Sequence, residues 1–268
     1  MKISVIIPTY KPGDYIWKCL DSICAQTLSK NLFEVLVVLN GCDEPFRRCL
    51  QNGLHKRSEL NARLFQTNKA GVSNARNLAI DEAAGEYVCF IDDDDWISET
   101  YLENMLTLST KDSLVVSNVK DYDEENDVMK DGYMTFAYNR NTDAKSVPLF
   151  RGRSFMSSSC CKLIPRYIIG DKRFDTRFRL GEDALFMACV SGNIKRLVLS
   201  NPNAIYFRRL RFSSASRHES RLNRTRYALM LSWAYIHQYF QDVRRYNLPF
   251  FISRIVASLM KIFKKSWI

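Results

Sequence analysis

The chain has 268 residues, of which 46% are hydrophobic and 12% aromatic, so it can bury the core of one large α/β domain or two small ones. Its formal net charge of +10 is typical of proteins that meet phosphate groups, nucleic acid or an anionic membrane surface. No run approaches the roughly 18 apolar residues that span a bilayer, and none of the eight cysteines forms a Cys-x-x-Cys pair, which argues against a zinc site. With no signal peptide before the first predicted strand, a cytoplasmic location is expected.

Strands and helices are predicted to alternate through the first 120 residues. Aliphatic and β-branched runs predict buried strands at 2–7, 35–39, 62–65 and 87–91. Apolar residues at helical spacing predict helices at 15–25, 46–56, 72–83 and 101–108. Pro8 is expected to end the first strand. This alternation indicates an α/β fold built from βαβ units around a mostly parallel sheet.

The ends of these strands carry polar residues. Segments 8–10, 40–43 and 92–95 each follow a predicted strand. Because ligands of such sheets bind at the carboxyl ends of the strands, the three segments are expected to share one crevice.

The alternation weakens after residue 117. The acidic segment 121–131 is predicted to be an exposed loop. Further along, an apolar helix is expected at 184–190 and another helix at 227–240, with short strands at 198–199 and 204–207. The last segment, 248–268, carries apolar residues at helical spacing among basic ones. It could lie in a membrane interface, or pack on the catalytic domain or a second subunit.

Four consecutive aspartates, Asp92 to Asp95, follow the apolar run 87–91. Adjacent carboxylates repel one another, and hard divalent cations such as Mg²⁺ and Mn²⁺ prefer carboxylate oxygens. A metal site is therefore one interpretation, and a solvated acidic turn or a helix cap is the other.

Five segments together resemble a family 2 glycosyltransferase of the GT-A fold: 5–10, 40–43, 68–77, 90–96 and 181–183. The resemblance covers about residues 1–216. It implies a nucleotide-sugar-binding half at 1–120 and an acceptor-binding half at 121–216. Residues 217–268 would form a helical C-terminal extension.

The resemblance implies that Pro8, Thr9 and Tyr10 contact the uracil and ribose of the donor. Where the family usually has an acidic stretch after the second strand, this chain has Asn40, whose amide can still bond a base. This departure leaves the identity of the donor's nucleotide base open, with UDP favoured.

The second base-side element of the family corresponds to 68–77, which assigns Asn68 and Gly71 to the donor site. Glycine would allow the backbone to approach the donor closely. Arg76 could hold a phosphate or form a structural salt bridge to the acidic stretch. Both roles stay open at this point.

The acidic stretch matches the Asp-x-Asp motif of the family. Asp94 and Asp92 are then ligands of Mn²⁺ or Mg²⁺, and Asp95 is a further candidate. Asp93 would occupy the variable position between them, beside the donor.

In the family the catalytic base lies in a Glu-Asp motif, which implicates Asp183, with Glu182 in support. Helix capping is the alternative role for Asp183. Arg208 and Arg211 lie in a late Arg-and-Ser segment that often folds over the donor, so either could neutralise the pyrophosphate.

The expected function is metal-dependent, inverting transfer of a hexosyl or N-acetylhexosaminyl group to a saccharide or lipid-linked acceptor, in surface polysaccharide synthesis. Peripheral attachment to the inner face of the membrane and a homo-oligomer are open possibilities. One alternative is a nucleotidyltransferase, which would need a Gly-rich loop after the first strand. The other is a basic nucleic-acid-binding module, which would leave the aspartates without a role, so no nucleic acid is expected.

Overall fold

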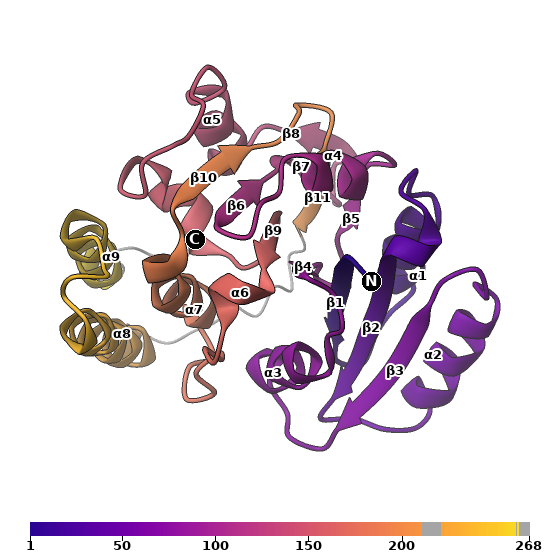
Figure 1. Ribbon diagram of the computed structural model, residues 1–268. Helices are drawn as coiled ribbons and strands as arrows, with labels where there is room; N and C mark the ends of the chain where they lie inside the picture. Colours follow the sequence, from indigo (N-terminus) through magenta and orange to yellow (C-terminus); the bar gives the residue numbers. More distant parts are fainter. Residues whose placement is uncertain (211–220, 261, 263–268) are drawn as a thin grey trace.

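The computed structural model describes residues 1–210, 221–260 and 262 of the chain (Figure 1). Eleven strands lie in this part, and most of the sequence-predicted strands are among them. They are β1 (Ile3–Thr9), β2 (Phe33–Asn40), β3 (Ala62–Thr67), β4 (Tyr87–Phe90), β5 (Trp96–Ile97), β6 (Ser113–Val116), β7 (Asn118–Asp123), β8 (Val128–Lys130), β9 (Lys162–Pro165), β10 (Arg196–Leu199) and β11 (Ile205–Leu210).

Helices cover the strands and end the described chain. The α-helices are α1 (Tyr15–Cys24), α2 (Phe46–His55), α3 (Val72–Glu82), α4 (Tyr101–Thr107), α5 (Tyr133–Asn139), α6 (Arg166–Ile169), α7 (Glu182–Val190), α8 (Arg221–Gln241) and α9 (Leu248–Met260). Short 3-10 helices occur at η1 (Lys30–Leu32), η2 (Arg151–Ser157) and η3 (Ser191–Asn193).

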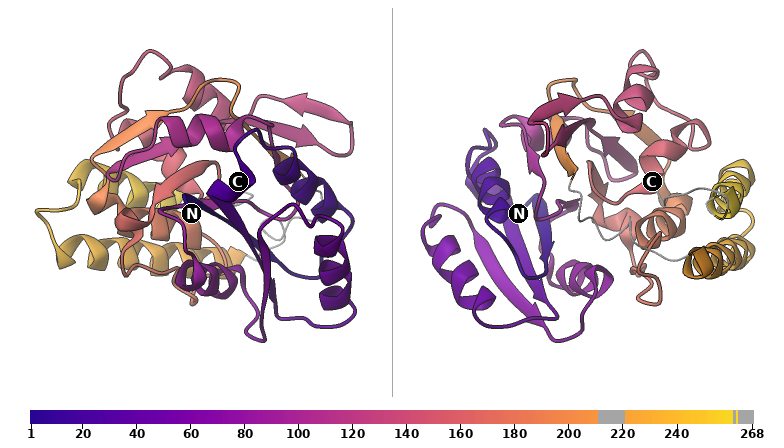
Figure 2. Two further views of the ribbon diagram at one scale, coloured as in Figure 1. Left: turned by 45° about the vertical axis from the view of Figure 1, so that its right-hand side comes forward. Right: turned by 180° about the vertical axis from the view of Figure 1, so that it is seen from behind.

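The main sheet has seven strands in the order β10-β6-β9-β4-β1-β2-β3. β1, β2, β3 and β4 pair in parallel, as predicted, and β9 enters antiparallel between β4 and β6. α1 and α2 lie on one face of the β1–β3 half and α3 on the other (Figures 1 and 2). The strands β1 and β2 are buried along their whole length, which explains their continuous apolar sequences.

Pro8 does not end the first strand, contrary to the prediction. β1 continues through Pro8 to Thr9, and Pro8 is in register with Val38 of β2. On its other side β1 pairs with β4 only as far as Ile6, whose carbonyl accepts a bond from Ile91. Residues two apart face the same neighbour, so Pro8 faces the position where β4 has already ended. Its missing N–H therefore costs no ladder bond.

A second sheet has the order β5-β11-β7-β8 and corrects the prediction for 121–131. That segment is not simply an exposed loop, because it includes the end of β7, a turn and β8. Asp121 is only 6% exposed, and both its carboxylate oxygens accept bonds from Arg208 of β11, at 2.9 and 2.8 Å. Asp121 and Arg208 are 87 residues apart in the sequence, and their pairing makes the polar strand β7 stable in a buried position.

The C-terminal helices lie beside each other at one edge of the molecule, next to α7 and far from β1–β3 (Figures 1 and 2). Within the described residues, no helix combines the length and apolar character that a bilayer span requires. The expected boundary at residue 216 falls outside the described part, so the division into domain and extension stays a prediction.

Candidate active site

Asn40 joins three loops at the carboxyl end of the parallel strands. Its Nδ2 donates to the backbone oxygen of Thr9 at 2.7 Å, and its Oδ1 accepts from the backbone nitrogen of Gly71 at 3.0 Å. Asn40 is 4% exposed, so these bonds replace its contacts with water. Gly71 has φ of 123°, which strains any residue with a side chain. The structure therefore gives Asn40 and Gly71 a role in holding these loops together, and their predicted donor contacts stay predictions.

The four aspartates lie in the loop between β4 and β5, and β11 holds this loop in place. The Tyr206 hydroxyl donates to Asp95 Oδ2 at 2.7 Å and accepts from the backbone nitrogen of Asp92 at 3.1 Å. The backbone nitrogen of Arg209 donates to Asp95 Oδ1 at 2.8 Å. Burial, and then the charges of Asp94 and Asp92, raise the pKa of Asp95 well above its ordinary value. Asp95 is thus a buried anchor of the loop.

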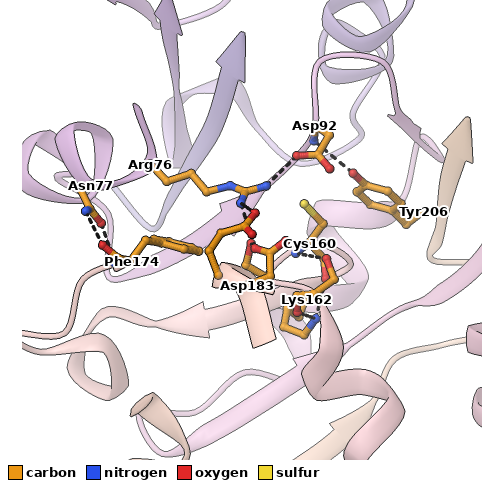
Figure 3. A network of polar contacts seen from close by, with 11 residues as sticks. Arg76, Asn77, Asp92, Cys160, Lys162, Phe174, Asp183 and Tyr206 are labelled. Atoms are coloured by element: carbon orange, nitrogen blue, oxygen red, sulfur yellow. Dashed lines mark hydrogen bonds and ion pairs between the residues drawn. The ribbon is translucent and has the colours of Figure 1, made fainter. Parts of the chain in front are cut away.

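Arg76 lies at the centre of the polar network in Figure 3. Its Nη2 donates to Asp92 Oδ1 and its Nη1 to Asp183 Oδ1, both at 2.9 Å, and Nη1 lies 3.7 Å from Glu182 Oε1. The guanidinium also lies over the Phe174 ring, 5.3 Å from its centroid. Burial alone would lower the pKa of Arg76, but the charges of Asp183 and Asp92 raise it above its ordinary value. Of the two roles left open for Arg76, the salt bridge to the acidic stretch is present, and a contact with a donor phosphate stays a prediction.

Asp183 begins the first turn of α7, and two donors orient its carboxylate. Arg76 and the Ser159 hydroxyl both donate to Oδ1, at 2.9 and 2.6 Å. The turn that carries Ser159 is held from below by Lys162, whose Nζ donates to the backbone oxygens of Ser158 and Cys160 at 2.6 Å each (Figure 3). Since both of these bonds go to Oδ1, Oδ2 is the oxygen better placed to meet a hydroxyl.

Glu182 differs from its neighbour Asp183 in burial. The Glu182 side chain is 11% exposed, whereas the Asp183 side chain is 22% exposed. Burial, and then the charge of Asp183, raise the pKa of Glu182, against the opposing effect of Arg76. Glu182 is therefore suited to support the site from beneath, and Asp183 is the carboxylate that a substrate can reach.

The remaining predicted residues differ in whether they contact this network. Thr9 donates to Asp93 Oδ2, which links the end of β1 to the acidic loop. Tyr10 is 51% exposed and Asn68 is also exposed, so neither is held by the site. Arg208 makes its bidentate contact with Asp121, so its charge is already compensated within the protein. Arg211 lies outside the described residues.

The carboxylates of Asp92 and Asp94 fit a hard divalent cation. Both residues are half-buried, and 42% of the Asp92 side chain remains exposed. Both Asp95 oxygens already accept hydrogen bonds, which makes Asp95 the least suited of the three predicted ligands. In the described residues no group of three or more His, Cys, Asp or Glu side chains could close around a metal ion. Two carboxylates leave most coordination positions to other oxygens, such as those of a diphosphate.

Three residues of the network were not identified from the sequence: Tyr206, Ser159 and Lys162. Tyr206 appeared only as part of a short strand, and its role depends on a partner 114 residues away. The serine triplet 157–159 was visible, but a run of serines alone does not indicate which hydroxyl meets a carboxylate. A buried lysine can be recognised only when its surroundings are known.

The sequence from residue 4 to residue 171 matches the family model described as Glycosyl transferase family 2. The chain belongs to this glycosyltransferase family. The matched region contains the acidic loop and Arg76, while Asp183 and Tyr206 follow it in the sequence. The predicted family is thereby confirmed.

Among curated proteins, the glycosyltransferase GlyA of Streptococcus pneumoniae is 30% identical over 233 residues, which cover 81% of this chain and 32% of GlyA. The poly(ribitol-phosphate) beta-N-acetylglucosaminyltransferase TarS of Staphylococcus aureus is 29% identical over 211 residues, which cover 77% of this chain and 35% of TarS. The chain thus spans about a third of the length of these relatives.

Solved structures show that the fold is GT-A, as predicted. S. aureus TarS 1–349 in complex with UDP-GlcNAc has a TM-score of 0.72 at 22% identity, covering 99% of this chain and 72% of that one. The mannosyltransferase PcManGT of Pyrobaculum calidifontis, in complex with GDP-Man and Mn²⁺, has a TM-score of 0.66 at 16% identity, covering 98% and 73%.

Proposed function

We propose that the protein is a metal-dependent, inverting glycosyltransferase. It moves a hexosyl or N-acetylhexosaminyl group from a nucleotide-diphosphate sugar, with UDP favoured, to a hydroxyl of a saccharide or lipid-linked acceptor in surface polysaccharide synthesis. The observation that carries the proposal is the bridge from Asp92 through Arg76 to Asp183. On this proposal the bridge would join the donor side to the proton acceptor through the buried guanidinium of Arg76. The complex of TarS with UDP-GlcNAc and the complex of PcManGT with GDP-Man and Mn²⁺ support a nucleotide-sugar reaction.

Asp92 and Asp94 would hold the divalent cation together with the two donor phosphates. When bound, the cation supplies positive charge to the nucleotide diphosphate as it leaves. Thr9 holds Asp93 beside this position, and Tyr206 and Arg209 fix Asp95 behind it. The chain's own contribution is thus a loop whose geometry is set before the donor arrives.

Asp183 would accept the proton of the attacking hydroxyl through Oδ2, while Arg76 and Ser159 fix Oδ1. The hydroxyl attacks the anomeric carbon as the bond to the diphosphate breaks, so one displacement inverts that centre. Two observations argue against the alternatives. Arg208 and Arg209 pair with Asp121 and Glu124, at 2.8 and 2.7 Å, and so are engaged by carboxylates of the chain rather than open to nucleic acid. Residues 10–14 after β1 contain a single glycine, whereas a nucleotidyltransferase would need a Gly-rich loop there.

The test is a panel of nucleotide sugars, with and without Mn²⁺, read by thermal shift and by release of nucleotide diphosphate. We expect a metal-dependent shift with a UDP-sugar. Asp94→Ala should abolish this shift, and Asp183→Asn should keep it while lowering transfer by about 10² to 10⁴-fold. Asp143→Asn, at an exposed aspartate, is the control. No response to any nucleotide sugar, or full transfer by Asp183→Asn, would overturn the proposal.

A further part of the proposal concerns location. α9 exposes an apolar residue at every fourth position: Leu248, Ile252, Val256 and Met260, each 47–56% exposed. We propose that this stripe lies against an anionic membrane surface. The protein would then be cytoplasmic and attached peripherally to the membrane. The basic residues Lys261, Lys264 and Lys265 lie outside the described residues.

Sedimentation with vesicles that contain anionic lipid tests this attachment. Ile252→Glu should reduce vesicle binding several-fold, because it places a charge in the stripe. Val128→Glu is the matched control, since Val128 is similarly exposed but lies on strand β8 rather than on α9. Equal vesicle binding by both variants would exclude a contact between the stripe and the membrane. A change in the molar mass of Ile252→Glu, measured by light scattering, would instead assign the stripe to a second copy of the chain.

A further inference from the structure

A cavity of about 570 Å³ lies outside the network of Figure 3, between α8, α7 and the segment 171–178. Its volume is within the range of sites that bind small molecules. None of Arg76, Asp183 or the acidic loop lines it. The site described above therefore leaves this cavity without a function.

The cavity combines an apolar base with an aromatic mouth. Phe178 and Leu185 line it and are each only 4% exposed, whereas Trp233 of α8 is 68% exposed. An exposed tryptophan offers a rigid apolar face and an N–H donor at low entropic cost. The carbon-bound hydrogens of a sugar ring can lie on such a face while its hydroxyls reach polar groups around it.

The charged groups of the wall are already neutralised. Arg177 makes a bidentate contact with Asp175, with a shortest distance of 2.6 Å. Arg173 is 2.6 Å from Asp81, and Lys172 is 3.4 Å from Asp171. The carboxylates would repel a phosphate, and the paired cations have little attraction left for one. Carboxylate, guanidinium and amide groups together can instead serve as acceptors and donors for hydroxyls.

The cavity and the catalytic network share two structural elements. Leu185 and Cys189 of α7 line the cavity, and Cys189 lies about 9 Å along the helix from Asp183. In the segment 171–178, Asn77 holds both the backbone oxygen and nitrogen of Phe174, at 2.9 and 2.7 Å. The same segment thus places the Phe174 ring under Arg76 and Phe178 in the cavity wall.

We propose that this cavity binds a neutral saccharide, as a subsite for the acceptor some way from the hydroxyl that reacts. Trp233 stacks on a sugar ring there, and the Asp175–Arg177 pair bonds its hydroxyls. The acceptor assignment rests on the proposed function, while saccharide binding can be measured without any donor.

Two variants of α8 provide a matched test. Trp233→Ala removes the aromatic face of the cavity, and Phe240→Ala removes an aromatic residue of similar exposure, 71%, that does not line it. Neither substitution opens a hole in the core. The full-length chain and both variants are applied, without donor, to immobilised neutral oligosaccharides of glucose, galactose and N-acetylhexosamines, with phosphorylated counterparts on the same array.

We expect the wild-type chain and Phe240→Ala to bind the same neutral glycans, and Trp233→Ala to bind them about tenfold more weakly or worse. The absence of binding to any glycan, equal loss in both variants, or preference for the phosphorylated forms would each overturn the proposal. Calorimetry of UDP with Mn²⁺ on the same samples separates the two claims. UDP binding without glycan binding rejects only the subsite, and glycan binding without UDP binding rejects only the proposed reaction.

Discussion

At the scale of single residues, Arg76 makes the most contacts that matter to the proposed reaction. It is 2% exposed and lies within ion-pair distance of Asp92, Asp183 and Glu182. A buried cation is stable only when carboxylate partners are present, and removing Arg76 would leave its three carboxylates without this counter-charge. Arg76 therefore couples the geometry of the donor side to that of the base.

Arg76→Lys should lower transfer by about 100-fold, because a lysine ammonium cannot reproduce the planar fork that reaches Asp92 and Asp183 together. The measurement is kcat and KM for donor and acceptor. We expect most of the loss in kcat, since both carboxylates lose their orientation. Arg196→Lys, at an exposed arginine of β10 that lies 4.0 Å from Asp112, should leave these constants unchanged. A loss confined to donor KM would show that Arg76 contacts only the donor.

Lys162→Met should destabilise the protein by about 1–3 kcal/mol, because the backbone oxygens of Ser158 and Cys160 lose their donor in a fully buried position. Methionine keeps much of the volume, so the effect reports the lost bonds. Urea unfolding measures it. Burial lowers the pKa of Lys162, so removing a costly buried cation opposes the loss. Greater stability in the variant would show that this second effect dominates.

At the scale of elements, β11 ties the second sheet to the acidic loop. Tyr206 and Arg209 reach the loop from β11, while Arg208 of the same strand pairs with Asp121 of β7. The loop contains four carboxylates and cannot be held by apolar packing alone. Its conformation is thus set by a strand more than 100 residues later in the sequence.

Tyr206→Phe should weaken Mn²⁺-dependent UDP binding by about tenfold, because Asp95 and the backbone nitrogen of Asp92 lose a buried partner worth about 1–3 kcal/mol. Calorimetry with UDP and Mn²⁺ measures it. Tyr138→Phe also removes a buried hydroxyl, whose partner is the backbone oxygen of Ser200, and serves as the control. If the two variants bind UDP equally well, the anchor has no part in the donor site.

At the scale of the whole molecule, the buried acids set the dependence of stability on pH. Burial raises the pKa of Glu182 and of Asp95 in the folded state, whereas in the unfolded chain both titrate near pH 4. Above that pH the folded state binds more protons than the unfolded state. The free energy of unfolding must then fall as the pH rises.

We therefore expect the metal-free protein to lose stability between pH 5 and pH 8, by up to about 1.4 kcal/mol per group and pH unit. Urea unfolding at each pH measures this. Glu182→Gln should flatten the fall, because glutamine does not ionise. The lowered pKa of Glu34 and of Asp123 acts only at more acidic pH and does not mask the effect. Stability that rises over this range would contradict the assignment.

The sequence was sufficient to predict the parallel half of the fold, because β1, β2 and α3 carry local patterns that burial imposes. It was insufficient for β7 and β8, since Asp121 is polar and becomes buried only by pairing with Arg208. The same reason explains the site. Asp92, Asp94 and Asp183 stand out as charged residues in motifs, whereas Tyr206, Ser159 and Lys162 gain their roles from partners that no local pattern specifies.

The anchoring of the acidic loop by Tyr206 has a consequence for synthesis on the ribosome. Tyr206 is made 114 residues after Asp92, which takes roughly 6–23 s at ordinary rates of translation. During this interval the nascent chain carries Asp95 without its two hydrogen-bond donors, because Tyr206 and Arg209 have not yet been made. The β1–β4 core can form early, but the loop it carries waits for one of the last strands to be made.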